Sequence, residues 1–178
     1  SLDRVEVLRG AHSALFGTDA MASVVQLVTK RAQRPNLVAS LEAGSYDTRR
    51  GALSAGTAPG RWDVSGHASR YETSNRVANN DFRNTTLSGN GGVRLTDSST
   101  LRFVGRGEIG HAGSPGATAF GRPDLDAFYD RQLVVGGVTL DQQRGPWQQR
   151  ATYALSASYA ESTNLLVDPP YTPAFEGR

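Results

Sequence analysis

The feature that most constrains this chain is a two-residue alternation of apolar and polar side chains, which runs through most of the sequence after residue 36. In the segment 101–110, LRFVGRGEIG, the apolar residues Leu101, Phe103 and Ile109 alternate with charged ones. Successive side chains of a strand point to opposite faces, so the pattern predicts strands with one apolar and one polar face. We count about seven such strands, in the segments 37–46, 48–57, 61–71, 85–96, 101–110, 131–142 and 147–159.

The connections between these segments differ in length. Those at 58–60, 97–99 and 144–146 are tight turns, whereas those at 72–84 and 110–130 are long. Strands joined in this way form an antiparallel meander. Short turns at one end and long loops at the other are typical of a β-barrel of the outer-membrane type.

Alternation alone fits two all-β architectures. In a soluble sandwich the apolar face packs on a second sheet, whereas in an outer-membrane barrel it meets lipid and the polar face lines the lumen. The apolar face here carries many Gly and Ala residues, which suit lipid tails better than a sandwich core that must be filled. The polar face carries long charged groups that suit a wet lumen, and six of them are our lumen-facing candidates: Glu42, Arg94, Arg102, Arg106, Glu108 and Arg150. The pattern therefore favours an antiparallel transmembrane β-barrel, with a soluble Gly-rich β-sandwich binding module as the alternative.

Composition and motifs narrow the class of function. The net charge of +2 gives no basis for nucleic-acid binding, and the absence of cysteine excludes disulfides and thiolate metal sites. The sequence contains no apolar run of about 18 residues, so it predicts no transmembrane helix. The sequence GRGEIG at 105–110 has the spacing of a dinucleotide-binding loop, but its glycines lie inside an alternating segment that no helix follows. We therefore predict neither an enzyme nor a bound cofactor.

The long connections are the expected ligand-binding regions. Three aromatic residues there offer a stacking surface to a ligand: Phe120, Phe128 and Tyr129. Three acids in the same region have a spacing that could hold Ca²⁺: Asp124, Asp126 and Asp130. Pro123 before these acids instead favours a short helical turn with carboxylates near its N-terminus.

The start of the chain follows a different pattern. The segment 5–30 reads VEVLRGAHSALFGTDAMASVVQLVTK, in which two strand-like runs flank a turn. It resembles the end of the plug domain in TonB-dependent outer-membrane receptors, with a signature close to V-E-V-x-R-G-P-x-S-x-L-Y-G and then V-I-N-I-x-T-K. The residues that fall on this plug motif are Arg9, Gly10, Ser13, Phe16 and Gly17. Departures from it are Ala11 for Pro, Ala22-Ser23 for Gly-Gly, and Gln26 for Asn. At Gly10 and Gly17 we expect a positive φ or a close backbone approach.

The resemblance implies a domain organisation and a function. Residues 1–34 would be the end of a plug domain, and residues 35–178 the first strands of a barrel of about 22 strands. The family, which includes siderophore and cobalamin receptors, takes up scarce bulky nutrients (ferric chelates, cobalamin, haem or oligosaccharides) across the bacterial outer membrane. Implied partners are outer-membrane lipid, the small-molecule nutrient, and the inner-membrane TonB energy-transducing complex. We expect an internal fragment that lacks the segment contacting TonB. A passive outer-membrane channel or adhesin barrel is the alternative.

Overall fold

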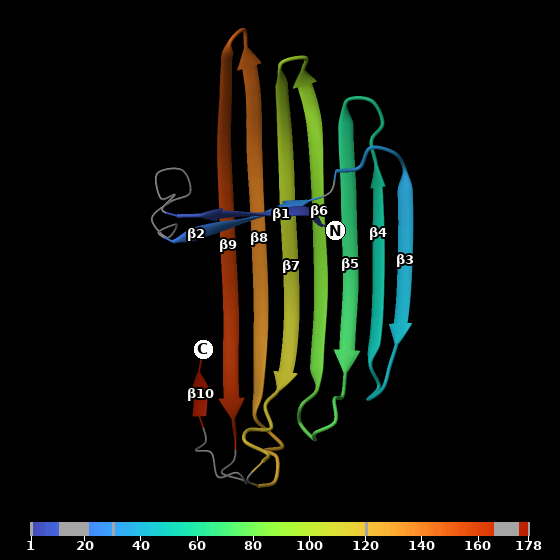
Figure 1. Ribbon diagram of the computed structural model, residues 1–178, viewed down its shortest axis with the longest axis vertical. Helices are drawn as coiled ribbons and strands as arrows, with labels where there is room; N and C mark the ends of the chain where they lie inside the picture. The colour runs from blue at the N-terminus through green and yellow to red at the C-terminus, as the bar shows by residue number, and fades with distance from the viewer. Residues whose placement is uncertain (1, 11–21, 30, 120, 166–174, 178) are drawn as a thin grey trace.

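The computed structural model describes residues 2–10, 22–29, 31–119, 121–165 and 175–177, and the described chain folds into two separate antiparallel sheets (Figure 1). The described residues contain no helix. None of them therefore belongs to a helix long and apolar enough to span a membrane. The all-β prediction is confirmed.

The larger sheet has eight strands in the order β10-β9-β8-β7-β6-β5-β4-β3, so neighbours in sequence are neighbours in space. All of its paired strands are antiparallel. The strands are β3 (Asn36–Ala43), β4 (Arg49–Thr57), β5 (Trp62–Thr73), β6 (Phe82–Thr96), β7 (Ser99–Gly113), β8 (Phe128–Arg144), β9 (Trp147–Asn164) and β10 (Phe175–Gly177). The seven predicted strands correspond to β3 through β9. The sheet is open, with β3 and β10 at its edges, as expected of part of a barrel wall.

The connections sort to the two ends of the sheet as predicted (Figure 1). Gly60 and Gly145 have φ of 67° and 57°, a left-handed conformation that glycine adopts without strain, and they shape two of the tight turns. The long connections are shorter than predicted, spanning 74–81 and 114–127, because the strands extend further at this end. We call this the loop end and the opposite one the turn end.

The smaller sheet is a hairpin of β1 (Leu2–Arg9) and β2 (Ser23–Thr29). Gly10 follows β1 with φ of 108°, as expected, and its N–H donates to the Ala22 carbonyl at 2.9 Å. On β1 a hydrogen bond to Glu6 at 2.5 Å raises the pKa of the Arg4 guanidinium. Ser13, Phe16 and Gly17 lie outside the described residues. The two sheets divide between Thr29 and Asn36, and a domain boundary at 34/35 stays a prediction.

The described chain has almost no hydrophobic core. Ala127, 7% exposed, is its one buried hydrophobic residue. Large apolar side chains lie open instead, among them Leu41 at 89% and Leu87 at 65% exposure. A sandwich would cover such residues with a second sheet, and no second sheet packs on the eight strands within the described chain. The sandwich alternative is therefore wrong.

Candidate functional site

The eight-stranded sheet has one apolar face, which its register defines row by row. One row across the sheet holds Leu53, Ala68, Leu87, Gly107, Val134 and Ala157. On β7 this apolar face runs from Leu101 to Ile109, about 27 Å at about 3.4 Å per residue. At a tilt of about 40° this length spans about 21 Å, close to the apolar band of about 25 Å on outer-membrane barrels. The apolar face therefore has the character and height of a lipid-facing wall.

The opposite, polar face carries all six lumen-facing candidates. Candidates on the same strand are separated by an even number of residues, and the register places those on different strands on the same face. Most are engaged by neighbours within the sheet. Glu42 lies 3.6 Å from Arg50, Arg94 donates to the Gly60 carbonyl at 3.4 Å, Arg106 donates to Glu108 at 2.7 Å, and Arg150 donates to Asp141 at 2.5 Å. These pairs orient the side chains along the wall. Contacts of these groups to a plug stay a prediction.

Arg102 is held more firmly than the other candidates. Its two terminal nitrogens donate to the two carboxylate oxygens of Asp63 at 2.9 and 3.0 Å, and the side chains are 15% and 22% exposed. The guanidinium crosses the intervening strand at Gly92, where a Cβ would lie 2.8 Å from Asp63 Oδ2 and 2.9 Å from Arg102 Cζ. Arg102 therefore ties β5 to β7 across β6, a structural role that sequence reasoning missed because it depends on register.

We expect Gly92→Ala to destabilise the protein by about 1–3 kcal/mol, since the new methyl group displaces a bidentate, charge-assisted pair and leaves both partners unsatisfied. The measurement is the free energy of unfolding in detergent micelles. Gly107→Ala is the matched control, because a Cβ there meets nothing within 4 Å. Equal stability of the two variants would contradict the role of Arg102.

The long connections at the loop end are joined to each other. The Asn79 side-chain amide donates to the Ala127 carbonyl at 2.8 Å, which ties 74–81 to 114–127. The Gly113 N–H donates to the Asp81 carbonyl at 2.9 Å. A Cβ on Gly113 would lie 2.8 Å from the Asn79 carbonyl carbon, so glycine permits this close approach. The two connections therefore form one layer over the end of the sheet.

The two aromatic ligand candidates that the structure describes lie on opposite faces of the sheet. Phe120 is outside the described residues, and Phe128 is on the apolar face, stacked on His111 with ring centroids 5.8 Å apart. Tyr129, 41% exposed, is on the polar face. Sequence reasoning missed Tyr71 and Phe82, which lie on the polar face at the loop end with ring centroids 5.9 Å apart. Tyr71 and Asp63 are separated by an even number of residues along β5, so the alternation of side chains could have predicted that Tyr71 lies on the polar face.

The acids of 124–130 are not arranged as a metal site. Asp124 is 1% exposed, and its Oδ1 accepts the N–H groups of Asp126 at 3.1 Å and Ala127 at 2.8 Å. Asp130 belongs to β8 and lies 2.6 Å from His111 Nδ1. The described residues include no group of three His, Cys, Asp or Glu side chains that could hold a metal ion. The predicted helical turn is wrong, because Asp124 satisfies these N–H groups in a non-helical turn.

We expect Asp124→Ala to destabilise this turn by about 1–3 kcal/mol, because two N–H groups lose a buried acceptor. Amide hydrogen exchange in micelles should become faster in 121–127 than in the unaltered protein. Asp97→Ala, which changes an exposed acid in a tight turn, is the control. Unchanged exchange at 121–127 would show that Asp124 does not hold the turn.

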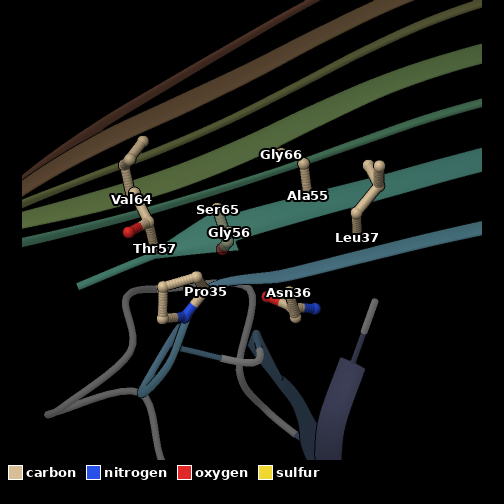
Figure 2. Close-up of a pocket in the computed structure, with 9 residues that line it drawn as sticks. All are labelled: Pro35, Asn36, Leu37, Ala55, Gly56, Thr57, Val64, Ser65 and Gly66. Atoms are coloured by element: carbon tan, nitrogen blue, oxygen red, sulfur yellow. The ribbon is translucent and has the colours of Figure 1, made fainter.

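A shallow hollow of about 600 Å³ lies at the start of β3. Figure 2 shows the residues lining it, from Pro35 and Asn36 to Val64 and Gly66. A Cβ on Gly56 would lie 3.0 Å from the Ala32 Cβ and 2.9 Å from Asn36 Oδ1. Gly56 is on the polar face, since it pairs with Asn36 and Ser65. The segment that leads from the hairpin into the sheet therefore lies against the polar face.

Comparisons with known proteins agree with this geometry. No family model matches the chain. Over 60 residues, 33% of this chain, the sequence is 35% identical to the vitamin B12 transporter BtuB of three Vibrio cholerae serotype O1 strains, and the match covers 10% of that protein. The fold is similar to the alcaligin outer membrane receptor FauA from Bordetella pertussis, with a TM-score of 0.72 and 20% identity. It is also similar to the siderophore receptor PiuA from Acinetobacter baumannii, with a TM-score of 0.67 and 16% identity.

The chain has the fold of an outer-membrane receptor barrel. Both structural matches cover 92% of this chain and 27% of the solved receptor, so the chain corresponds to a part of such a barrel. The matches confirm the predicted barrel fold, the resemblance to TonB-dependent receptors, and the bacterial outer membrane as the location that this receptor fold occupies. The apolar face is then the side toward lipid, and the polar face the side toward the lumen.

Proposed function

We propose that this protein is a TonB-dependent receptor that takes up a scarce, bulky nutrient across the outer membrane. The observation that carries the proposal is the path of the chain at Gly56. The segment after the plug-like hairpin lies against the polar face at Ala32, on the lumen side of the wall, where a plug would enter. Residues 1–34 are then the end of the plug, and 35–178 the first strands of the wall.

In this proposal the protein works as a gate and catalyses no reaction. A nutrient binds at the loop end and shifts the equilibrium of the plug, and the TonB complex supplies the work that completes the opening. The solved structures that share the fold are receptors, which supports a transport role over an enzymatic one. Tyr71, Phe82 and Tyr129 give the lumen side an aromatic surface near its loop end.

The nutrient is a siderophore-type ferric chelate or a cobalamin in this proposal. Partial sequence similarity to a vitamin B12 transporter supports cobalamin, and the fold shared with two siderophore receptors supports a ferric chelate. Uptake of radiolabelled cobalamin and of iron-loaded siderophores by cells with and without the gene separates these ligands. We expect one class to depend on the gene.

Deletion of TonB from the same cells tests the coupling to energy. We expect gene-dependent uptake to fall to the level of the gene deletion when TonB is absent, and to return when TonB is restored. Uptake that persists without TonB would favour the passive-channel alternative and contradict the proposal.

A further inference from the structure

The apolar face ends abruptly at the loop end in a row of acidic and basic side chains, which we call the outer polar row. The row consists of Arg49, Glu72, Arg83, His111, Asp130 and Glu161, one residue from each of β4 to β9. The row below it contains Arg70, Thr85, Ile109, Gln132 and Tyr159. These residues lie on the same face as the lipid-facing side chains, so their charges are directed away from the lumen.

The two rows line a hollow of about 350 Å³ that reaches from β5 to β9. The charged side chains around it remain accessible, with Arg70 at 59%, Arg83 at 53% and Asp130 at 43% exposure. Arg70 pairs with Glu72 on its own strand and donates to Thr85 of β6 at 3.1 Å, which holds its guanidinium between these two side chains. Within the described chain Arg83 pairs with Asp81 through its Nε at 3.8 Å, which leaves its terminal nitrogens for another acceptor.

Charge is distributed unevenly over the two rows. On β4–β6 they carry Arg49, Arg70 and Arg83 against one acid, Glu72, whereas on β8–β9 they carry Asp130 and Glu161 with Gln132 and Tyr159. Guanidinium groups bind phosphate through paired N–H donors. Carboxylate, amide and phenol groups bind hydroxyls. The arrangement matches a headgroup that carries both phosphate and many hydroxyls better than a purely anionic one.

We propose that the hollow binds the phosphorylated sugar headgroup of a glycolipid in the outer leaflet. The proposal rests on the membrane placement assumed in the proposed function. Ile109 lines the hollow and Leu87 lies one row below it on the same face; they are 64% and 65% exposed, where the acyl chains of the same lipid would lie. A single lipid with a polar headgroup and acyl chains can therefore contact both the outer polar row and the apolar surface next to it. Arg70 and Arg83 contact the phosphate, and Asp130, Gln132 and Glu161 contact sugar hydroxyls.

Binding of lipid A to the intact, detergent-purified protein, measured by native mass spectrometry, tests this proposal. We expect the double variant Arg70→Gln with Arg83→Gln to bind lipid A at least about 10-fold more weakly, a loss of about 1.4 kcal/mol. Arg70→Lys with Arg83→Lys, which keeps the charge, should retain most of the binding. Arg61→Gln with Arg144→Gln removes the same charge at exposed positions of the turn end and should bind as the unaltered protein does.

Three further ligands test which parts of the lipid the protein recognises. Dephosphorylated lipid A, phosphatidylglycerol and glucose 1-phosphate should each bind more weakly than lipid A, since each lacks the phosphate, the sugar or the acyl chains. Unchanged binding by the glutamine variant, or phosphatidylglycerol binding as tight as lipid A, would overturn the proposal. The lipid-binding assay does not measure nutrient uptake. Its result can therefore be interpreted even if the uptake test fails, and each proposal can fail without the other.

Discussion

Replacing Leu155 with arginine should destabilise the protein by about 2–4 kcal/mol in a lipid bilayer, the cost of a cationic side chain on the lipid face near the membrane midplane. Leu155 is 50% exposed on the apolar face and pairs with Gly136, in the middle of the apolar rows. At a half-exposed position in contact with water, a substitution by arginine would be tolerated well. The expected loss therefore comes from lipid. Denaturant unfolding of the intact protein in phospholipid vesicles measures it.

Ser156→Arg is the matched control for this prediction, because Ser156 is the next residue of β9 and lies on the polar face. A charge there enters the wet lumen, so we expect a change below about 1 kcal/mol. Equal destabilisation by the two substitutions would show that both faces of β9 meet the same environment. Greater destabilisation by Ser156→Arg would reverse the assignment of the faces.

The second large effect concerns the chain of 178 residues in plain buffer, which we expect to aggregate without a cooperative thermal transition. The hydrophobic effect stabilises a soluble domain by burying apolar surface, and Ala127 is the one buried hydrophobic residue of the described chain. Edge strands with unpaired backbone groups and large exposed apolar surfaces both promote association. The edge strand β3 is exposed along its whole length.

The measurement is thermal unfolding followed by circular dichroism at several protein concentrations, with and without micelles. Micelles should reduce aggregation by covering the apolar face. A cooperative transition in plain buffer that does not depend on concentration would contradict the account, because it would require a core that the described residues lack.

The sequence predicted the strands well where alternation involved apolar residues. The predicted end of the strand at residue 110 falls short of the observed end of β7 at Gly113, because His111 and its neighbours on the apolar face are polar and resemble a loop in composition. β5 extends to Thr73 for the same reason. The outer polar row is thus invisible to a search for apolar alternation.

Other features depend on register and could not be predicted from local pattern. The Arg102–Asp63 pair joins residues 39 positions apart through a gap at Gly92. Phe128 points to the apolar face because of where β8 begins, which the composition of the preceding loop does not encode. The motif at Arg9 and Gly10 predicted the turn after β1, since it requires a positive φ.

The central claim is that one face of this sheet meets lipid and the other meets the lumen. The most direct test is a spin-label scan of residues 102–109 in the intact protein in bilayers, helped by the absence of cysteine from this chain. We predict high accessibility to oxygen, which partitions into lipid, at Phe103, Gly105 and Gly107, and low accessibility at the alternating positions on the polar face. Equal oxygen accessibility at both sets of positions, or alternation of the opposite phase, would contradict the account.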